Sequence, residues 1–75
     1  MSITEDANTV FLESENHSFK ITRYESGNCK NVPAQYASGM LFTYKDINGY
    51  GWQVTIYDGE IRKRNIPNSK FDEWS

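Results

Sequence analysis

The sequence predicts a small all-β protein built on a five-stranded antiparallel sheet. Short runs of β-branched and aromatic residues alternate with turn residues along most of the chain. Two of the turns, Asn48-Gly49 and Asp58-Gly59, carry the residue pairs that favour hairpins. A length of 75 residues, with 37% hydrophobic and 24% charged residues, is typical of one globular domain and not of a disordered chain.

The N-terminal part is predicted to contribute two strands. Residues 1–8 are polar and are expected to be frayed, so that the folded domain covers residues 9–75. Residues 9–13 are then expected to form the first strand. Residues 18–24 follow as the second, because Phe19 and Ile21 alternate with polar side chains.

The long stretch between residues 25 and 39 is expected to be mainly irregular. Pro33 suits the first position of a helix and Gly39 suits a helix end. An α+β alternative therefore stays open, in which a helix at about 32–38 packs on a flatter sheet.

The central hairpin has two possible registers, and the apolar pattern favours one of them. A loop over residues 47–49, with Gly49 in the left-handed position, pairs Met40 with Ile56, Phe42 with Val54 and Tyr44 with Trp52. A two-residue turn would instead mix apolar with polar partners, and a slip of one residue turns every side chain over. This apolar face is the predicted core. The opposite, outer face would carry Leu41, Thr43, Lys45, Gln53 and Thr55.

The C-terminal part is predicted to end the sheet and close it. A type I′ turn at residues 58–59 pairs Ile56 with Ile61, which places Arg62 and Arg64 on the outer face. Residues 68–75 are expected to form a short helical turn. Because five strands leave two edges unless the sheet closes, we expect a small SH3-like barrel.

Catalytic and metal-binding signatures are missing from the sequence. The single histidine, His17, and the single cysteine, Cys29, form no metal-ligand motif, and one cysteine allows no internal disulfide. The glycines match no phosphate-binding loop. We therefore expect a protein that is not an enzyme and needs neither cofactor nor metal.

The remaining signals indicate binding to another protein. Tyrosine and tryptophan beside arginine are typical of protein–protein hot spots. The predicted partner-binding residues are Tyr57, Arg62, Arg64, Phe71 and Trp74, with an unpaired strand edge as a second route. Small chains of this kind often act as regulators or inhibitors of larger proteins, including those encoded by phage and mobile elements. A homodimer would use the same residues.

An alternative is a small barrel that binds single-stranded or structured nucleic acid. Its cations would be Lys45, Arg62, Lys63 and Arg64. A net charge of −2 argues against an electrostatic binder that uses its whole surface. No apolar run approaches the roughly 20 residues that span a bilayer, and no signal peptide is visible, so we expect a soluble, cytoplasmic protein without membrane contact.

Overall fold

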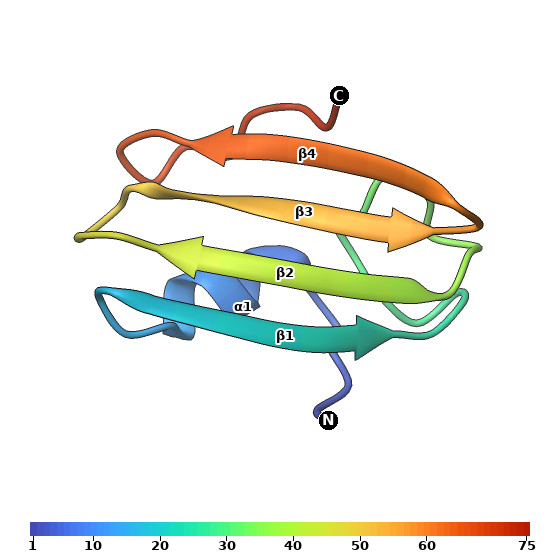
Figure 1. Ribbon diagram of the computed structural model, residues 1–75. Coiled ribbons are helices and arrows are strands. Elements are labelled where there is room, and N and C mark those ends of the chain that lie inside the picture. Colours follow the sequence, from blue (N-terminus) through green and yellow to red (C-terminus); the bar gives the residue numbers. More distant parts are fainter.

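A computed structural model, which describes all 75 residues, shows one open antiparallel sheet and one short helix (Figure 1). The elements are α1 (Ala7–Glu13), β1 (Ser18–Tyr24), β2 (Gly39–Lys45), β3 (Gly51–Tyr57) and β4 (Glu60–Ile66). The strands lie in the order β1-β2-β3-β4. The prediction of five strands curled into an SH3-like barrel is therefore wrong, because four strands form a sheet that does not close.

The segment that was predicted to form the first strand forms the helix instead. Residues 9–13 were expected to be extended, but they belong to α1, whose N-cap Asp6 accepts a hydrogen bond from the backbone N–H of Asn8 at 2.9 Å. Ala7 and Phe11 lie one turn apart and are fully buried beneath the helix. A carboxylate cap and one apolar stripe that packs on the sheet therefore outweigh the local strand propensity.

The predicted hairpin registers are confirmed. Met40 pairs with Ile56, Phe42 with Val54 and Tyr44 with Trp52, while Ile56 pairs with Ile61 across the next turn. In that second turn Asp58 and Gly59 both have positive φ, +49° and +76°, as a type I′ turn requires.

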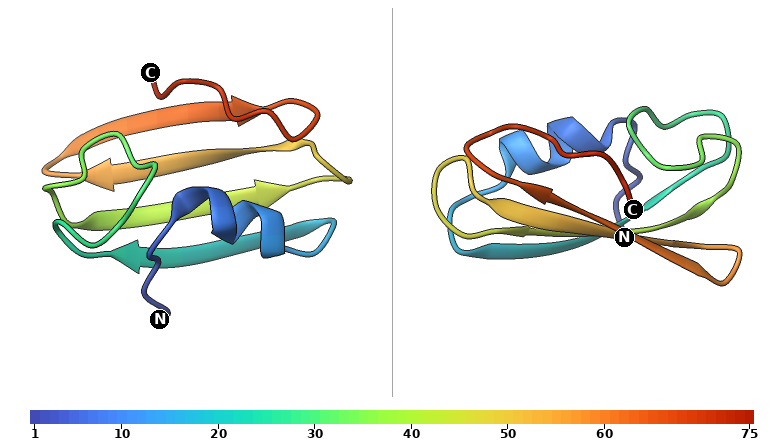
Figure 2. Two further views of the ribbon diagram at one scale, coloured as in Figure 1. Left: turned by 180° about the vertical axis from the view of Figure 1, so that it is seen from behind. Right: turned by 90° about the horizontal axis from the view of Figure 1, so that it is seen from above.

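The predicted choice of core face is wrong. α1, the loop over residues 25–38 and the C-terminal segment all cover the same side of the sheet (Figure 2). On that side Gln53 and Thr55 are 0% exposed and Thr43 is 1% exposed, although all three were expected to face solvent. The apolar side chains that were expected to form the core lie on the other, open side. Strand pairing fixes which side chains share a face, but the covering segments decide which face is buried.

Polar side chains suit the covered face because they hydrogen-bond to the helix. The Lys45 ammonium donates to the carbonyls of Phe11, Leu12 and Ser14 at 3.2, 3.4 and 3.0 Å, where the helix ends. The Gln53 amide donates to the carbonyl of Ala7 at 2.8 Å. The sheet thus holds the helix at both ends, with Lys45 at its C-terminal carbonyls and Gln53 at its first residue.

The remaining connections contain no helix. Residues 32–38, the site of the alternative helix, form bends and turns instead. Residues 68–75 form no helical turn either, because the segment extends along β4: Lys63 and Ser75 exchange two backbone hydrogen bonds, of 3.1 and 2.9 Å. The compact apolar cluster is small, with Ala7, Tyr24, Cys29 and Leu41 at its centre.

Candidate protein-binding face

The uncovered side of the sheet, which we call the open face, is a regular array of mostly apolar side chains. Three residues from each of the four strands point to this side, and nine of these twelve residues are apolar or aromatic. Figure 2 shows that no other segment lies over it. The open face consists of Phe19, Ile21, Arg23, Met40, Phe42, Tyr44, Trp52, Val54, Ile56, Ile61, Lys63 and Asn65.

Several of these side chains are strongly exposed. Ile61 is 68% exposed, Phe19 55%, Ile21 41%, Trp52 38% and Ile56 37%. The other apolar members are half-buried, and only by their neighbours on the same face. Scattered exposed apolar residues are ordinary, but a contiguous patch rimmed by polar residues marks an interaction site.

The aromatic members gather at one end of the open face. The Tyr44 and Trp52 rings stack with centroids 5.4 Å apart, and the Phe19 ring lies 6.3 Å from that of Phe42 and 6.2 Å from that of Trp52. The register places aliphatic residues, Met40, Ile56 and Ile61, at the other end. The face is therefore bulky at one end and slimmer at the other.

The charge on the open face is sparse and of one sign. Arg23 on β1 and Lys63 on β4 are the only charged residues among these twelve. Asp46, just beyond β2, reaches the aromatic end, where its Oδ1 accepts from the Tyr44 hydroxyl at 3.4 Å. Arg23 makes an exposed ion pair of 3.5 Å with Glu25, which constrains it little. The centre of the face is thus free of charge.

Both edges of the sheet are partly occupied by the chain itself. The backbone N–H of Thr4 donates to the carbonyl of Arg23 at 2.7 Å, and that of Arg23 donates to the carbonyl of Ser2 at 3.1 Å, along β1. The segment that ends in Ser75 pairs with β4 in the same way. Addition of a partner strand at an edge is therefore restricted, whereas access to the open face is not.

The predicted partner-binding residues are mostly on the covered side. Tyr57 is 8% and Arg64 6% exposed, so neither offers a side chain to an incoming partner. The structure does bring Arg64, Phe71 and Trp74 together: the guanidinium lies 4.7 Å from the Phe71 ring centre and 4.6 Å from that of Trp74. In this arrangement the two rings hold the C-terminal segment against the sheet.

Hydrogen bonds complete the environment of Arg64. Its Nε and Nη2 donate to Oε1 of Gln53 at 2.9 and 2.6 Å, and Nη2 also donates to Oδ1 of Asn8 at 2.7 Å. Burial lowers the pKa of Arg64 to about 10, which leaves the guanidinium charged at neutral pH. The residue links β4, β3, the helix and the C-terminal segment.

The four cations of the nucleic-acid alternative do not form one patch. Lys45 and Arg64 are buried under the helix and the C-terminal segment, and Arg62 is half-buried on the same side in a 3.5 Å ion pair with Glu60. Lys63 points to the open face. The sheet therefore separates Lys63 from the other three.

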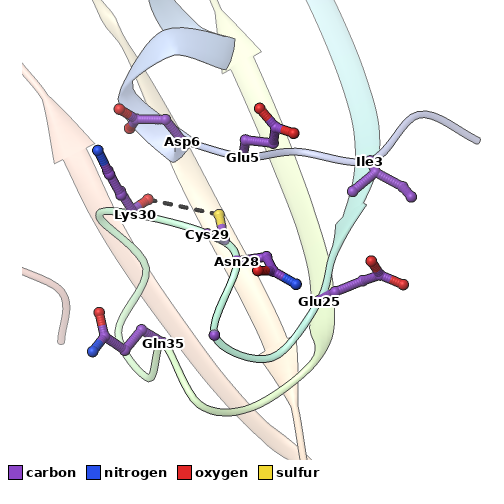
Figure 3. Close-up of a pocket in the computed structure, with 9 residues that line it drawn as sticks. Ile3, Glu5, Asp6, Glu25, Asn28, Cys29, Lys30 and Gln35 are labelled. Atoms are coloured by element: carbon purple, nitrogen blue, oxygen red, sulfur yellow. Dashed lines mark hydrogen bonds between the residues drawn. The ribbon is translucent and has the colours of Figure 1, made fainter.

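A second feature is a polar hollow of about 710 Å³ between the N-terminal segment and the loop that follows β1 (Figure 3). Cys29 lies in its wall, and its thiol donates to the carbonyl of Lys30 at 3.6 Å. Burial, with the nearby Asp6 carboxylate, raises the pKa of Cys29 to about 11. The thiol is therefore protonated at neutral pH and is a poor nucleophile. No group of three or more His, Cys, Asp or Glu side chains is placed to hold a metal ion.

Comparisons of the chain with protein-family models, with curated proteins and with solved structures found no match. The one helix falls short of the length and hydropathy that crossing a bilayer requires.

Sequence reasoning identified the members of the open face but assigned them to the interior. The signal that it missed is the helix. Asp6 precedes Ala7, Val10 and Phe11, which follow the i, i+3, i+4 spacing of one helical face after an acidic cap. A helix at this position must pack on one face of the sheet. The polar face suits it, because Lys45 and Gln53 donate hydrogen bonds to the carbonyls of the helix.

Proposed function

We propose that the chain is a non-catalytic protein-binding module that holds its partner against the open face. The observation that carries this proposal is the continuous array of apolar side chains on an uncovered sheet. Its five most exposed members are between 37% and 68% exposed. At roughly 200 Å² for a large side chain, they present roughly 500 Å² of apolar surface. This lies in the upper range of the largest apolar patch on a monomer.

The composition of the open face also suits protein recognition. Aromatic residues, methionine and arginine are enriched at the cores of protein interfaces, and lysine and carboxylates are depleted there. The open face holds four aromatic residues, one methionine and one arginine, and its one lysine lies on the outer strand β4. Action as a cytoplasmic regulator or inhibitor of a larger protein belongs to the same proposal.

Nucleic-acid binding is the second candidate, and one observation favours it. Exposed rings on the same face as Arg23 and Lys63 resemble, in chemistry, the platforms on which unpaired bases stack. Two observations weigh against it. The rings of Tyr44 and Trp52 already stack on each other, and most of the predicted cations lie on the covered side.

Site-specific photo-cross-linking tests the proposal. A photoreactive phenylalanine analogue replaces Phe19 on the open face or, as a control, Tyr36, which is 79% exposed in the loop on the covered side. We expect a discrete protein adduct from position 19 only. Purified wild-type chain should compete with its formation, the Ile56→Lys variant should not, and nuclease should leave the adduct unchanged.

Two results would contradict the proposal. Equal adducts from both positions would mean that the open face has no special affinity for proteins. Loss of the adduct on nuclease treatment, with steep weakening in added salt, would favour the nucleic-acid candidate instead.

A further inference from the structure

We infer that the partner on the open face is a second copy of this chain, packed face to face about a two-fold axis that runs across the strands. The inference rests on the proposed function, because it names the occupant of the same face. Three features of the face support it: its area, its change in bulk from end to end, and the positions of its two charges.

The area of the open face matches that of a small but specific dimer interface. Two copies of a patch of roughly 500 Å² bury roughly 1,000 Å² together, before the half-buried Met40, Phe42, Tyr44 and Val54 are added. That reaches the lower bound for a specific interface. Pairing of two such sheets also completes the two-layer arrangement by which sheets usually bury an apolar face. The helices would then lie on the outside of the sandwich (Figure 2).

The change in bulk along the strands makes the face self-complementary. Phe19, Tyr44 and Trp52 form the aromatic end, and Met40, Ile56 and Ile61 lie at the aliphatic end. A two-fold axis across the strands sets the aromatic end of one copy on the aliphatic end of the other. The two sheets then stay evenly spaced, at about 10 Å. An axis along the strands would set aromatic on aromatic and leave the aliphatic ends apart.

The two cations also fit this arrangement. Arg23 and Phe19 lie on β1 at opposite ends of the open face, Arg23 at the aliphatic end and Phe19 at the aromatic end. In the dimer the Arg23 guanidinium therefore lies over the Phe19 ring of the second copy, and the two-fold axis repeats this contact. Lys63 lies on the edge strand β4, midway between the two ends of the open face. In the dimer it lies near Lys63 of the second copy at the rim, where both ammonium groups reach water. No charge is buried without a partner. Two cations of one sign are few for an anionic vesicle or a nucleic acid.

Sedimentation of the purified full chain over roughly 1 to 500 μM tests the inference. We expect a reversible monomer–dimer equilibrium. Ile56→Lys should weaken it about 100-fold, because a tenfold loss per copy acts twice in a symmetric dimer. Leu12→Lys, at a position 56% exposed on the outer side of the helix, should leave it unchanged. If Ile56→Lys does not fold, Phe19→Ser against Leu12→Ser, at positions 55% and 56% exposed, provides a milder matched pair.

The direction of the axis has its own test. In a mixture of wild type with Lys63→Glu, we expect heterodimers in excess of the statistical half, because opposite charges then meet across the axis. An axis along the strands places Lys63 over Ile21 and gives no such excess, so a statistical mixture would overturn the proposed axis.

The outcomes separate this inference from the proposed function. A monomer at all concentrations that still forms the competed protein adduct from position 19 would overturn the dimer and leave the binding module. A monomer without that adduct would overturn both. A dimer that survives Ile56→Lys would place self-association elsewhere and overturn the inference. So would binding of the wild-type monomer, but not of Ile56→Lys, to anionic phosphatidylserine vesicles.

Discussion

Replacement of Arg64 by alanine should destabilise the fold far more than replacement of Arg62, although both side chains lie on the covered face of β4. Arg64 is 6% exposed, and three of its hydrogen bonds, two to Gln53 and one to Asn8, end in the interior. Arg62 is half-buried and makes one ion pair of 3.5 Å with Glu60. The comparison therefore isolates the buried network from the strand itself.

The expected magnitude follows from the contacts. Arg64→Ala leaves Oε1 of Gln53, a residue 0% exposed, without a donor, at a cost of about 1–3 kcal/mol. Loss of the guanidinium from between the Phe71 and Trp74 rings adds about 0.5–2 kcal/mol for each ring. The free energy of unfolding should fall by roughly 4 kcal/mol in total, against roughly 4–11 kcal/mol for a whole domain of this size. Arg62→Ala should cost less than about 1 kcal/mol.

Urea unfolding followed by far-ultraviolet circular dichroism measures both variants. With a slope of roughly 1–2 kcal/mol/M, the Arg64→Ala midpoint should fall by roughly 2 M or more, and the Arg62→Ala midpoint by well under 1 M. Arg64→Lys should fall between them, because lysine keeps the charge but loses the planar fork. Equal midpoints for Arg64→Ala and Arg62→Ala would refute the idea that Arg64 anchors the fold.

Three further predictions concern other parts of the chain. Gly51→Ala should lower the free energy of unfolding by at least about 2 kcal/mol in the same urea assay. An added Cβ would collide with the backbone carbonyl of Tyr44 and approach Phe11 Cε1 to 2.7 Å. A urea midpoint equal to that of the wild type would contradict this prediction. Burial raises the pKa of Tyr24 to about 12. The tyrosine therefore ionises first in the unfolded chain, and the free energy of unfolding should fall as pH rises above about 10. Tyr24→Phe should flatten that decline, and an unchanged pH profile would rule this out. Trp74→Ala should speed amide hydrogen exchange in β4 next to the C-terminal segment. The indole N–H donates to the carbonyl of Asn31 at 2.9 Å, and the ring covers Arg64. Exchange rates equal to those of the wild type would show that the segment is held without Trp74.

The sequence was sufficient for local pairing but not for the assembly of layers. Alternation of apolar residues and the Asn48-Gly49 and Asp58-Gly59 turns predicted both hairpin registers correctly, because register depends on neighbouring strands and their turn. The burial of one face depends on segments distant in sequence. Local strand propensity predicts a strand over residues 9–13, where the structure has the helix that covers the polar face.

The candidate site was predicted only in part, for the same reason. Arg64, Phe71 and Trp74 were predicted to be partner-binding residues, and the structure places them against one another on the covered side, with Arg64 buried and the two rings half-buried. The usual expectation that apolar side chains are buried assigned Trp52 and Ile56 to the core. That expectation fails on this sheet, because α1, the loop over residues 25–38 and the C-terminal segment cover the polar face instead.

Thiol accessibility at two neighbouring positions of β3 measures the inverted sheet most directly. Thr55→Cys and Ile56→Cys introduce thiols at sites that are 0% and 37% exposed in the wild type. Labelled at nanomolar concentration, where each chain stands alone, the thiol at position 56 should react at close to the rate of an unfolded chain. The thiol at position 55 should be protected, as buried Cys29 is. Rapid labelling at 55 together with protection at 56 would mean that the apolar face is the interior after all.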